Sequence, residues 1–154
     1  DAIFAIFKHH RRKLILLTEK PFDDFLCRSK WFEKIITIER NLFYFKDITN
    51  IKKLTSEFEF DYVYDLQTSN RTSHYLKIFS DKKTITNGIG KYSKIPHTNL
   101  YRNQMHTIER QKDQLNLCNI NYKSKINLDW MFSSNFPIPK ENYVIVVPGG
   151  SKKE

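Results

Sequence analysis

The stretch KLILLTEKPFDDFLCRSKWFEKIITIER, residues 13–40, decides the fold class of this chain. Its first part holds the apolar run 14–17, which is too short for a helix and is bounded by charged residues, as in a strand buried on both faces. A second apolar run covers residues 35–38, and the segment between the two runs, residues 21–31, has helical spacing. We therefore expect two parallel strands joined by a crossover helix.

The helix expected over residues 21–31 begins with a proline, which suits the first turn of a helix. Phe22, Phe25 and Leu26 fall on one face at helical spacing, so we expect them to point into the core.

The alternation of strand and helix continues through most of the chain. We expect the polar residues 91–103 to form a loop. The order indicates an α/β fold, a Rossmann-like parallel sheet with crossover helices. The further elements expected are a helix over residues 48–58, a strand over 62–66, a helix with Tyr75, Leu76 and Phe79 inward, a strand over 84–86 and a helix over 105–118.

A domain boundary is expected near the end of the chain. Pro137 and Pro139 lack the amide donor that a helix or a central strand needs. We expect a first domain over residues 1–136, a linker over 137–142, and the first strand and turn of a second domain over 143–154, with the rest of that domain lying beyond this sequence.

Composition excludes several classes of protein. The chain has 154 residues, 40% of them hydrophobic, which is enough for one packed core. Cys27 and Cys118 stand too far apart in sequence for a paired-thiol zinc site, and the histidines show no ligand spacing with them, so we expect no metal. No apolar run approaches the roughly 20 residues that span a bilayer.

The net charge of +9 has two interpretations. One is a solvated, lysine-rich surface, and the other is attraction to an anionic partner such as a phosphorylated sugar, a lipid head group or nucleic acid. Nucleic-acid binding needs aromatic side chains interleaved with arginine on an exposed face, whereas the aromatic residues here fall mostly in apolar runs. We therefore expect no nucleic-acid partner.

The strand expected over residues 143–147 runs directly into Pro148, Gly149, Gly150 and Ser151. In α/β proteins such glycines let backbone amides and the start of the next helix face a phosphate. A Pro-Gly turn also ends many strands for local reasons alone. Both interpretations stay open on these residues.

Four segments of the chain, in order, resemble the glycosyltransferase family 9 heptosyltransferases. DYVYDLQTSNRTSHYL (residues 61–76) is similar to that family's strand ending in Asp-Leu-Gln with its polar loop and basic residue. MHTIERQKDQLNLCNI (105–120) resembles its His-x-x-Glu-Arg helix. YVIVVPGGSKKE (143–154) resembles the strand and turn that open its second domain, and DAIFAI (1–6) resembles the start of its first helix.

The resemblance implies an inverting, metal-independent glycosyltransferase of the two-domain GT-B type that needs no cofactor. The first domain would hold the acceptor, a lipopolysaccharide core or a related anionic surface glycan, and the second an ADP-heptose-like donor. It also implies a cytoplasmic protein with possible peripheral contact at the inner face of the cell membrane. A nucleotide- or phosphosugar-binding α/β module without transfer activity is the alternative, and this chain alone is expected to be inactive.

Asp1 matches the aspartate that serves in the family as general base toward the acceptor hydroxyl. The chemistry is sound, since an inverting displacement needs one carboxylate within hydrogen-bond reach of the attacking oxygen. The competing interpretation is that Asp1 only caps the helix that follows it.

Two further groups of residues carry the resemblance. Gly149, Gly150 and Ser151 match the turn that meets the donor diphosphate, and Lys153 is a candidate for the lysine that follows it. Asp65, Asn70 and Arg71 are the candidate acceptor-binding residues. Asp65 lies where a strand ends, which is where ligands approach α/β sheets, and Arg71 would face an acceptor anion or form a surface salt bridge.

Overall fold

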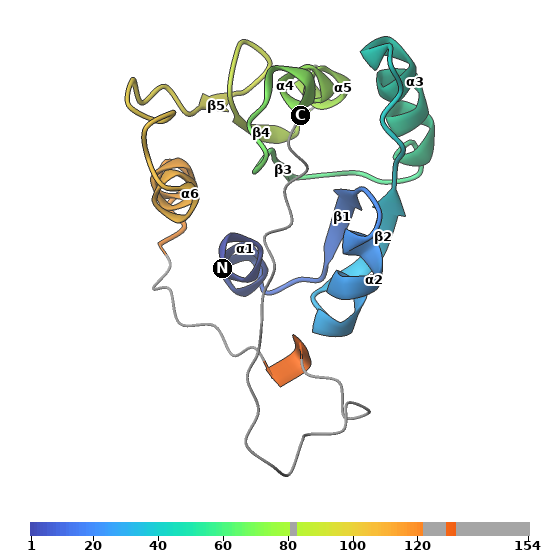
Figure 1. Ribbon diagram of the computed structural model, residues 1–154, viewed down its shortest axis with the longest axis horizontal. Helices are drawn as coiled ribbons and strands as arrows, with labels where there is room; N and C mark the ends of the chain where they lie inside the picture. Colours follow the sequence, from blue (N-terminus) through green and yellow to red (C-terminus); the bar gives the residue numbers. More distant parts are fainter. Residues whose placement is uncertain (81–82, 122–128, 132–154) are drawn as a thin grey trace, which may run out of the picture.

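The computed structural model describes residues 1–80, 83–121 and 129–131, and these form an α/β fold built on parallel strands (Figure 1). The linker and the strand expected over residues 143–147 lie outside the described residues. The strands are β1 (Leu14–Thr18), β2 (Phe32–Thr37), β3 (Tyr62–Tyr64), β4 (Ile85–Gly88) and β5 (Ile95–Pro96). The helices are α1 (Ala2–His10), α2 (Phe22–Leu26), α3 (Tyr44–Leu54), α4 (Asn70–Tyr75), α5 (Lys77–Ser80) and α6 (Thr107–Asn116), with 3-10 turns η1 (Cys27–Ser29) and η2 (Asp129–Met131).

The described strands form two parallel sheets, β1-β2 and β3-β4-β5. Leu16 pairs with Ile35 in the first sheet, and Val63 pairs with Thr86 in the second. Strands β1 and β2 are joined through α2, and β3 and β4 through α4 and α5, whereas only the short loop 89–94 joins β4 to β5. The prediction of parallel strands joined by helices is therefore confirmed for β1-β2 and for β3-β4.

Two hydrophobic clusters lie among these elements. The first joins α1 to α6 through Ala2, Ala5, Ile6, Leu115 and Ile120, and the fully buried Leu115 contributes about 1.5–3 kcal/mol by leaving water. Two strand residues, Leu14 of β1 and Tyr64 of β3, pack against this cluster.

The second cluster is built on Ile38, Ile51 and Tyr75. It covers the other faces of the strands, because Leu17 of β1 packs here whereas Leu14 packs against α1, and residues three apart on a strand point to opposite faces. Ile51 of α3 has no exposed surface, so it lies at the centre of this cluster.

The expectation for the first crossover helix is wrong in its length and its inward face. Helix α2 covers only Phe22–Leu26 before the chain tightens into a 3-10 turn, so it is too short to lay a whole face on the sheet. Phe22 is 57% exposed and Phe25 is 40% exposed. The ring of Phe25 packs on Trp130 at 5.2 Å between centroids.

Two other boundaries differ from expectation. Helix α3 begins at Tyr44 and ends at Leu54, so it is displaced toward the amino end of the expected range 48–58. The loop expected over residues 91–103 contains the short strand β5. This strand was not predicted because its second residue is a proline, which lacks the amide donor of a central strand.

Strand β1 is present where it was expected, but it is not buried on both faces. All five of its residues are only half-buried. Leu14 contacts the first hydrophobic cluster and Leu17 the second, so each face of the strand is partly covered.

Candidate functional site

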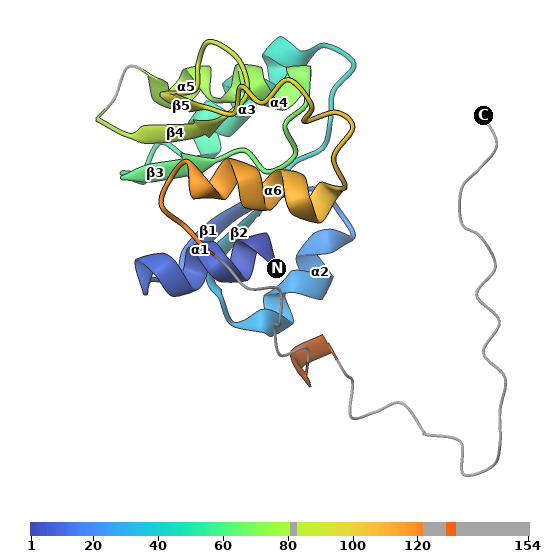
Figure 2. The same cartoon turned by 90° about the vertical axis from the view of Figure 1, so that its left-hand side faces the viewer.

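The amino end of α1 lies at the edge of the molecule where the strands end. The carboxyl end of this helix lies beside β3, since His10 Nε2 is 2.9 Å from the hydroxyl of Tyr64, and Arg12, which follows the helix, pairs at 3.6 Å with Asp61, just before the strand. Because α1 runs back along the sheet, its first residue lies at the opposite edge, on the same side as the beginning of α6 (Figure 2). Ligands approach α/β sheets from this edge.

Asp1 occupies the position that precedes α1, and its side chain makes no capping hydrogen bond. Its carbonyl accepts the amide of Ala5 at 3.0 Å, so the backbone starts the helix without help from the carboxylate. The residue is exposed. The carboxylate of Asp1 is therefore not used as a cap.

Asp65 follows β3 and organises the loop after it. One carboxylate oxygen accepts the amides of Gln67 and Thr68 at 3.1 and 3.0 Å, and the other accepts the Thr72 hydroxyl at 2.8 Å. Burial raises the pKa of Asp65, while these hydrogen bonds oppose the shift. The carboxylate is buried and fully engaged within the chain.

A second layer of amides fixes this loop to α6. The Gln114 side-chain amide donates to the carbonyl of Asp65 and to the side chain of Asn87, both at 2.9 Å. Gln114 has no exposed surface, and its own carbonyl oxygen is buried without a hydrogen-bond partner. The end of β3, the end of β4 and helix α6 are thus held together by polar contacts.

Arg102 contacts the same loop, and Arg110 lies near Arg102. Arg102 donates to the carbonyl of Thr68 at 3.1 Å, and the Nε atoms of Arg102 and Arg110 are buried without hydrogen-bond partners. Burial lowers the pKa of Arg102, the positive charge of Arg110 lowers it further, and Asp65 opposes the shift. The positive charge of Arg110 thus disfavours the charged form of Arg102, and an anion bound beside Arg102 would favour it.

A histidine–aspartate pair lies next to these arginines in sequence. His97 Nε2 is 2.9 Å from Asp113, which also accepts the side-chain amide of Asn99 at 2.7 Å. These hydrogen bonds hold the pKa of Asp113 below its usual range. His97 is buried, and its Nδ1 has no hydrogen-bond partner.

Arg71, a candidate for acceptor binding, forms an ion pair within the chain. Its guanidinium pairs with Asp47, with Nε 2.9 Å from the carboxylate, and it also contacts the Tyr75 hydroxyl at 3.0 Å. Burial alone would raise the pKa of Asp47, but hydrogen bonds from Tyr75, Asn41 and Arg71 hold it well below its usual range. Of the two roles expected for Arg71, the structure contains the salt bridge.

Of the remaining predicted site residues, only Asn70 lies within the described residues. Asn70 is exposed at the first turn of α4, and its carbonyl accepts from Ser73 and His74. The candidates for the donor turn lie outside the described residues: Gly149, Gly150, Ser151 and Lys153.

Sequence reasoning did not single out Arg102, Arg110 or Gln114. Arg110 lies in the quoted His-x-x-Glu-Arg motif, so the motif held a signal for it. Arg102 sits in a polar loop without any pattern, and Gln114 acts through a contact with a residue 49 positions away, which spacing cannot reveal.

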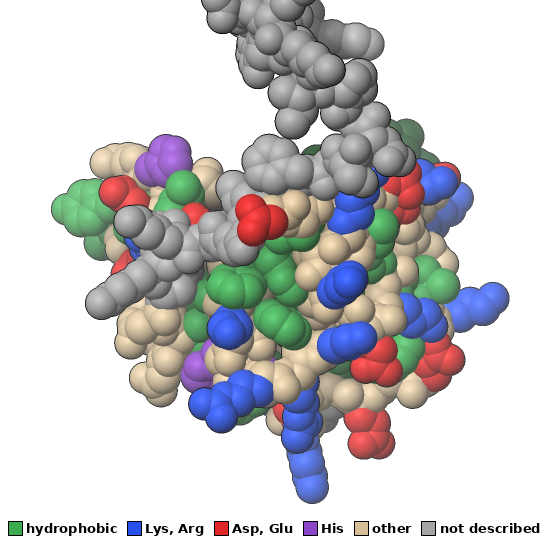
Figure 3. Space-filling view, turned by 90° about the horizontal axis from the view of Figure 1, so that it is seen from below, with side chains coloured by type: hydrophobic (Ala, Val, Ile, Leu, Met, Phe, Trp, Pro, Cys, Tyr) green, Lys and Arg blue, Asp and Glu red, His purple; other side chains and the backbone are tan. Residues whose placement is uncertain are grey.

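Other surface features lie away from this edge. Hollows of about 490 and 400 Å³ open beside Phe7, Lys8 and Arg11 of the first helix and its cap, and between β2 and the end of α3. On the face seen in Figure 3, Lys and Arg side chains are spread between hydrophobic and acidic ones. Within the described ranges no helix has the length and apolarity to cross a membrane, and no three metal-ligating side chains gather.

Neither a protein-family model, nor a curated protein, nor a solved structure matches this chain.

Proposed function

We propose that this chain is the acceptor-binding part of an inverting glycosyltransferase with a Rossmann-like, GT-B-type organisation. It would transfer a heptose or a similar sugar from an ADP-sugar to an anionic glycan, such as a lipopolysaccharide core. The resemblance of four ordered segments to family 9 heptosyltransferases supports the class. The observation that carries the proposal is the uncapped carboxylate of Asp1, at the edge of the sheet where the strands end.

In this proposal Asp1 takes the proton from the acceptor hydroxyl as that oxygen attacks the anomeric carbon. A general base must be able to reach its proton directly or through one water, so a carboxylate spent on a helix cap would be a poor candidate. Asp1 is exposed and makes no cap, and both properties support the role. Asp65 would not be the base. Its buried oxygens already accept three hydrogen bonds, so it would hold the shape of the loop after β3.

Arg102 and Arg110 would hold an anionic group of the acceptor. Their Nε atoms lack hydrogen-bond partners, and a bound anion would offset the positive charge of Arg110 that lowers the pKa of Arg102. The donor diphosphate would meet Gly149, Gly150, Ser151 and Lys153, as the resemblance implies. A lipid-anchored acceptor would bring the protein to the inner face of the cell membrane, where each basic residue near anionic lipid contributes about 1 kcal/mol.

Acceptor binding tests the first half of this proposal. We would titrate the chain with a delipidated, phosphorylated inner-core oligosaccharide by calorimetry and repeat the titration with Arg110→Gln. Loss of a charge-assisted contact of about 1.5–3 kcal/mol predicts affinity weakened by at least tenfold. Arg28→Gln, which changes an exposed arginine beyond α2, is the matched control and should bind as the parent does. Equal affinity for all three chains would exclude the arginine pair as the anion site.

The transfer step is tested on a polypeptide that also carries the donor-binding half. ADP release from ADP-heptose in the presence of the oligosaccharide is expected to fall at least 100-fold in Asp1→Asn, while acceptor affinity stays unchanged. Full rate in the variant would remove Asp1 from the mechanism. Acceptor and donor binding without any ADP release would favour the alternative of a non-catalytic sugar-binding module.

A further inference from the structure

The loop between β2 and α3 exposes a run of large apolar side chains. It contains the segment RNLFYFK, residues 40–46, in which Leu42 is 90% exposed and Phe43 and Phe45 are each more than half exposed. The rings of Phe43 and Phe45 stack with 5.7 Å between their centroids, and neither belongs to the two hydrophobic clusters of the core. Single exposed apolar residues are normal on a protein surface, whereas a contiguous exposed group marks an interaction site.

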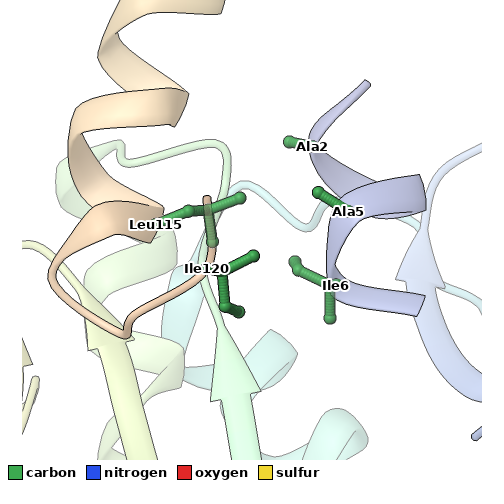
Figure 4. Close-up of a cluster of buried hydrophobic side chains, with 5 residues drawn as sticks. All are labelled: Ala2, Ala5, Ile6, Leu115 and Ile120. Atoms are coloured by element: carbon green, nitrogen blue, oxygen red, sulfur yellow. The ribbon is translucent and has the colours of Figure 1, made fainter. Parts of the chain in front are cut away.

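A second loop exposes apolar side chains at the same edge of the molecule. Leu100 is 90% exposed and Tyr101 is exposed too, and both lie between β5 and α6. At the other end of α6 the apolar residues are buried, because Leu115 and Ile120 pack in the cluster shown in Figure 4. In Figure 2, the loop before α3 and the loop before α6 both lie toward the right-hand side, where the strands end.

Both loops are held on one segment of the chain. Arg71 donates to the carbonyl of Asn41, which directly precedes the first exposed run. Arg102, next to Tyr101, donates to the carbonyl of Thr68 at 3.1 Å. Thr68 and Arg71 are three residues apart, so the two exposed groups are tied to one short stretch of the fold.

The charged side chains beside the exposed groups are basic. Segment 40–46 contains Arg40, which pairs with Glu19, and Lys46, which is exposed in the first turn of α3. The second loop carries Arg102 and, like segment 40–46, has no carboxylate of its own. The two hollows described above are lined by residues of other segments. Exposed apolar side chains with basic neighbours suit a soft anionic surface better than a peptide that needs a groove.

We propose that these two loops dock the protein on an anionic lipid bilayer. Leu42, Phe43 and Phe45 enter the interfacial layer from one loop, and Leu100 and Tyr101 enter it from the other, because leucine and aromatic side chains gain by leaving water at that depth. The basic residues beside them add attraction to the anionic head groups. The inference deepens the proposed function and rests on it for the choice of a membrane, since a lipid-anchored acceptor that binds at this edge reaches it from a bilayer.

Vesicle binding of the full chain tests this surface without any sugar present. The probe is a large unilamellar vesicle of equal parts phosphatidylcholine and phosphatidylglycerol, and binding is measured by co-flotation over a range of lipid concentrations. The double variant Phe43→Ser/Phe45→Ser is expected to bind at least about tenfold more weakly, because two aromatic rings no longer enter the bilayer. Its fold should persist, since Phe43 is the N-cap of α3 and serine is a favoured N-cap residue.

Two controls accompany the double variant. Leu117→Ser changes an exposed leucine at the other end of α6 and should bind the vesicles as the parent does. In the calorimetric titration with the delipidated oligosaccharide, the double variant should keep the affinity of the parent. The vesicles contain no glycan and that titration contains no bilayer, so failure of the docking and failure of the sugar binding are observed separately.

Insertion itself is measured with a tryptophan placed in the first loop. In Phe45→Trp, the fluorescence that remains after subtraction of the parent's signal should shift to the blue on adding vesicles, and brominated phosphatidylcholine should quench it. Leu117→Trp, at the other end of α6, should show neither effect.

Four results would overturn the inference. Equal vesicle affinity of the parent and the double variant would show that the first loop does not enter the bilayer. Equal affinity of the parent for vesicles of phosphatidylcholine alone would show that head-group charge is not recognised. Absence of binding at millimolar lipid would exclude a membrane as the partner. Self-association of the parent that the double variant loses, without vesicle binding, would identify a second copy of the chain as the occupant.

Discussion

Asp47→Asn is predicted to destabilise the fold strongly. The side chain of Asp47 is only 1% exposed, and Asn41 donates to one of its oxygens from both the backbone and the side-chain amide, each at 2.9 Å. Arg71 and the hydroxyl of Tyr75 donate to the other oxygen. Asparagine can keep the contacts from Asn41, but its NH₂ group would then face the donors of Arg71 and Tyr75.

The magnitude follows from what is left unpaired. Removing one partner of a buried ion pair costs about 3–5 kcal/mol, and the lower end applies because the side chain of Arg71 is 27% exposed and water can reach it. We expect a loss of about 3 kcal/mol at pH 7. Urea unfolding followed by tryptophan fluorescence measures it, and Asp24→Asn, at an exposed aspartate of α2, should stay within about 0.5 kcal/mol of the parent.

The pH dependence gives an independent check on the same residue. Hydrogen bonds hold the pKa of Asp47 in the folded chain below the unfolded value of about 3.9, so the folded state binds fewer protons. The stability that Asp47 contributes is therefore complete above about pH 5 and falls by up to about 1.4 kcal/mol per pH unit below pH 4. The difference between parent and Asp47→Asn should shrink over that range. A loss below 1 kcal/mol at pH 7, or a difference that is equal at pH 7 and pH 3, would refute this account of Asp47.

Three further substitutions test the core and the polar layer. Gly88→Ala would place a Cβ 2.9 Å from Leu76 Cδ1 and 3.0 Å from Asp65 Cβ, so we expect a loss of about 1–3 kcal/mol in thermal unfolding, and unchanged stability would contradict the close packing of β4. Gln114→Leu leaves the carbonyl of Asp65 and the side chain of Asn87 without their shared donor, and urea unfolding should show a loss of about 2–4 kcal/mol. Ile51→Val removes one buried methylene group and should cost about 1 kcal/mol, whereas no change in the unfolding midpoint would place Ile51 outside a tight core.

Strands β1, β2 and β3 could be predicted from sequence because each contains a short apolar run, whereas β5 was expected to be a loop. The run 14–17 lies within β1, and the run 35–38 overlaps β2, which begins earlier, at Phe32. Helix ends were harder to predict, because helix propensity and hydrophobic periodicity do not show where a helix stops packing against the rest of the fold. The short α2 is the example, since Phe22 and Phe25 fit a helical face that the tertiary structure leaves largely exposed.

The candidate site could be predicted only in part from the sequence, for a different reason. Asp65 was placed correctly at the end of a strand, but its partners come from a loop three residues on and from a helix 49 residues away. Arg71 and Asp47 are separated by 24 residues. The sequence therefore allowed a salt bridge of Arg71 as one alternative but did not identify Asp47 as its partner. Contacts of this kind depend on how the layers pack, which a single sequence does not encode in its spacing.

The central claim is that an anionic glycan binds where the strands end, beside Asp1 and the two arginines. Titrating the isotopically labelled chain with the phosphorylated inner-core oligosaccharide, and following every amide by NMR, tests it most directly. The account predicts that the largest shifts gather at Ala2, Thr68, Arg102 and Arg110. Shifts that gather instead at the opposite edge, around Arg11 and Arg12, or no shifts at millimolar oligosaccharide, would contradict it.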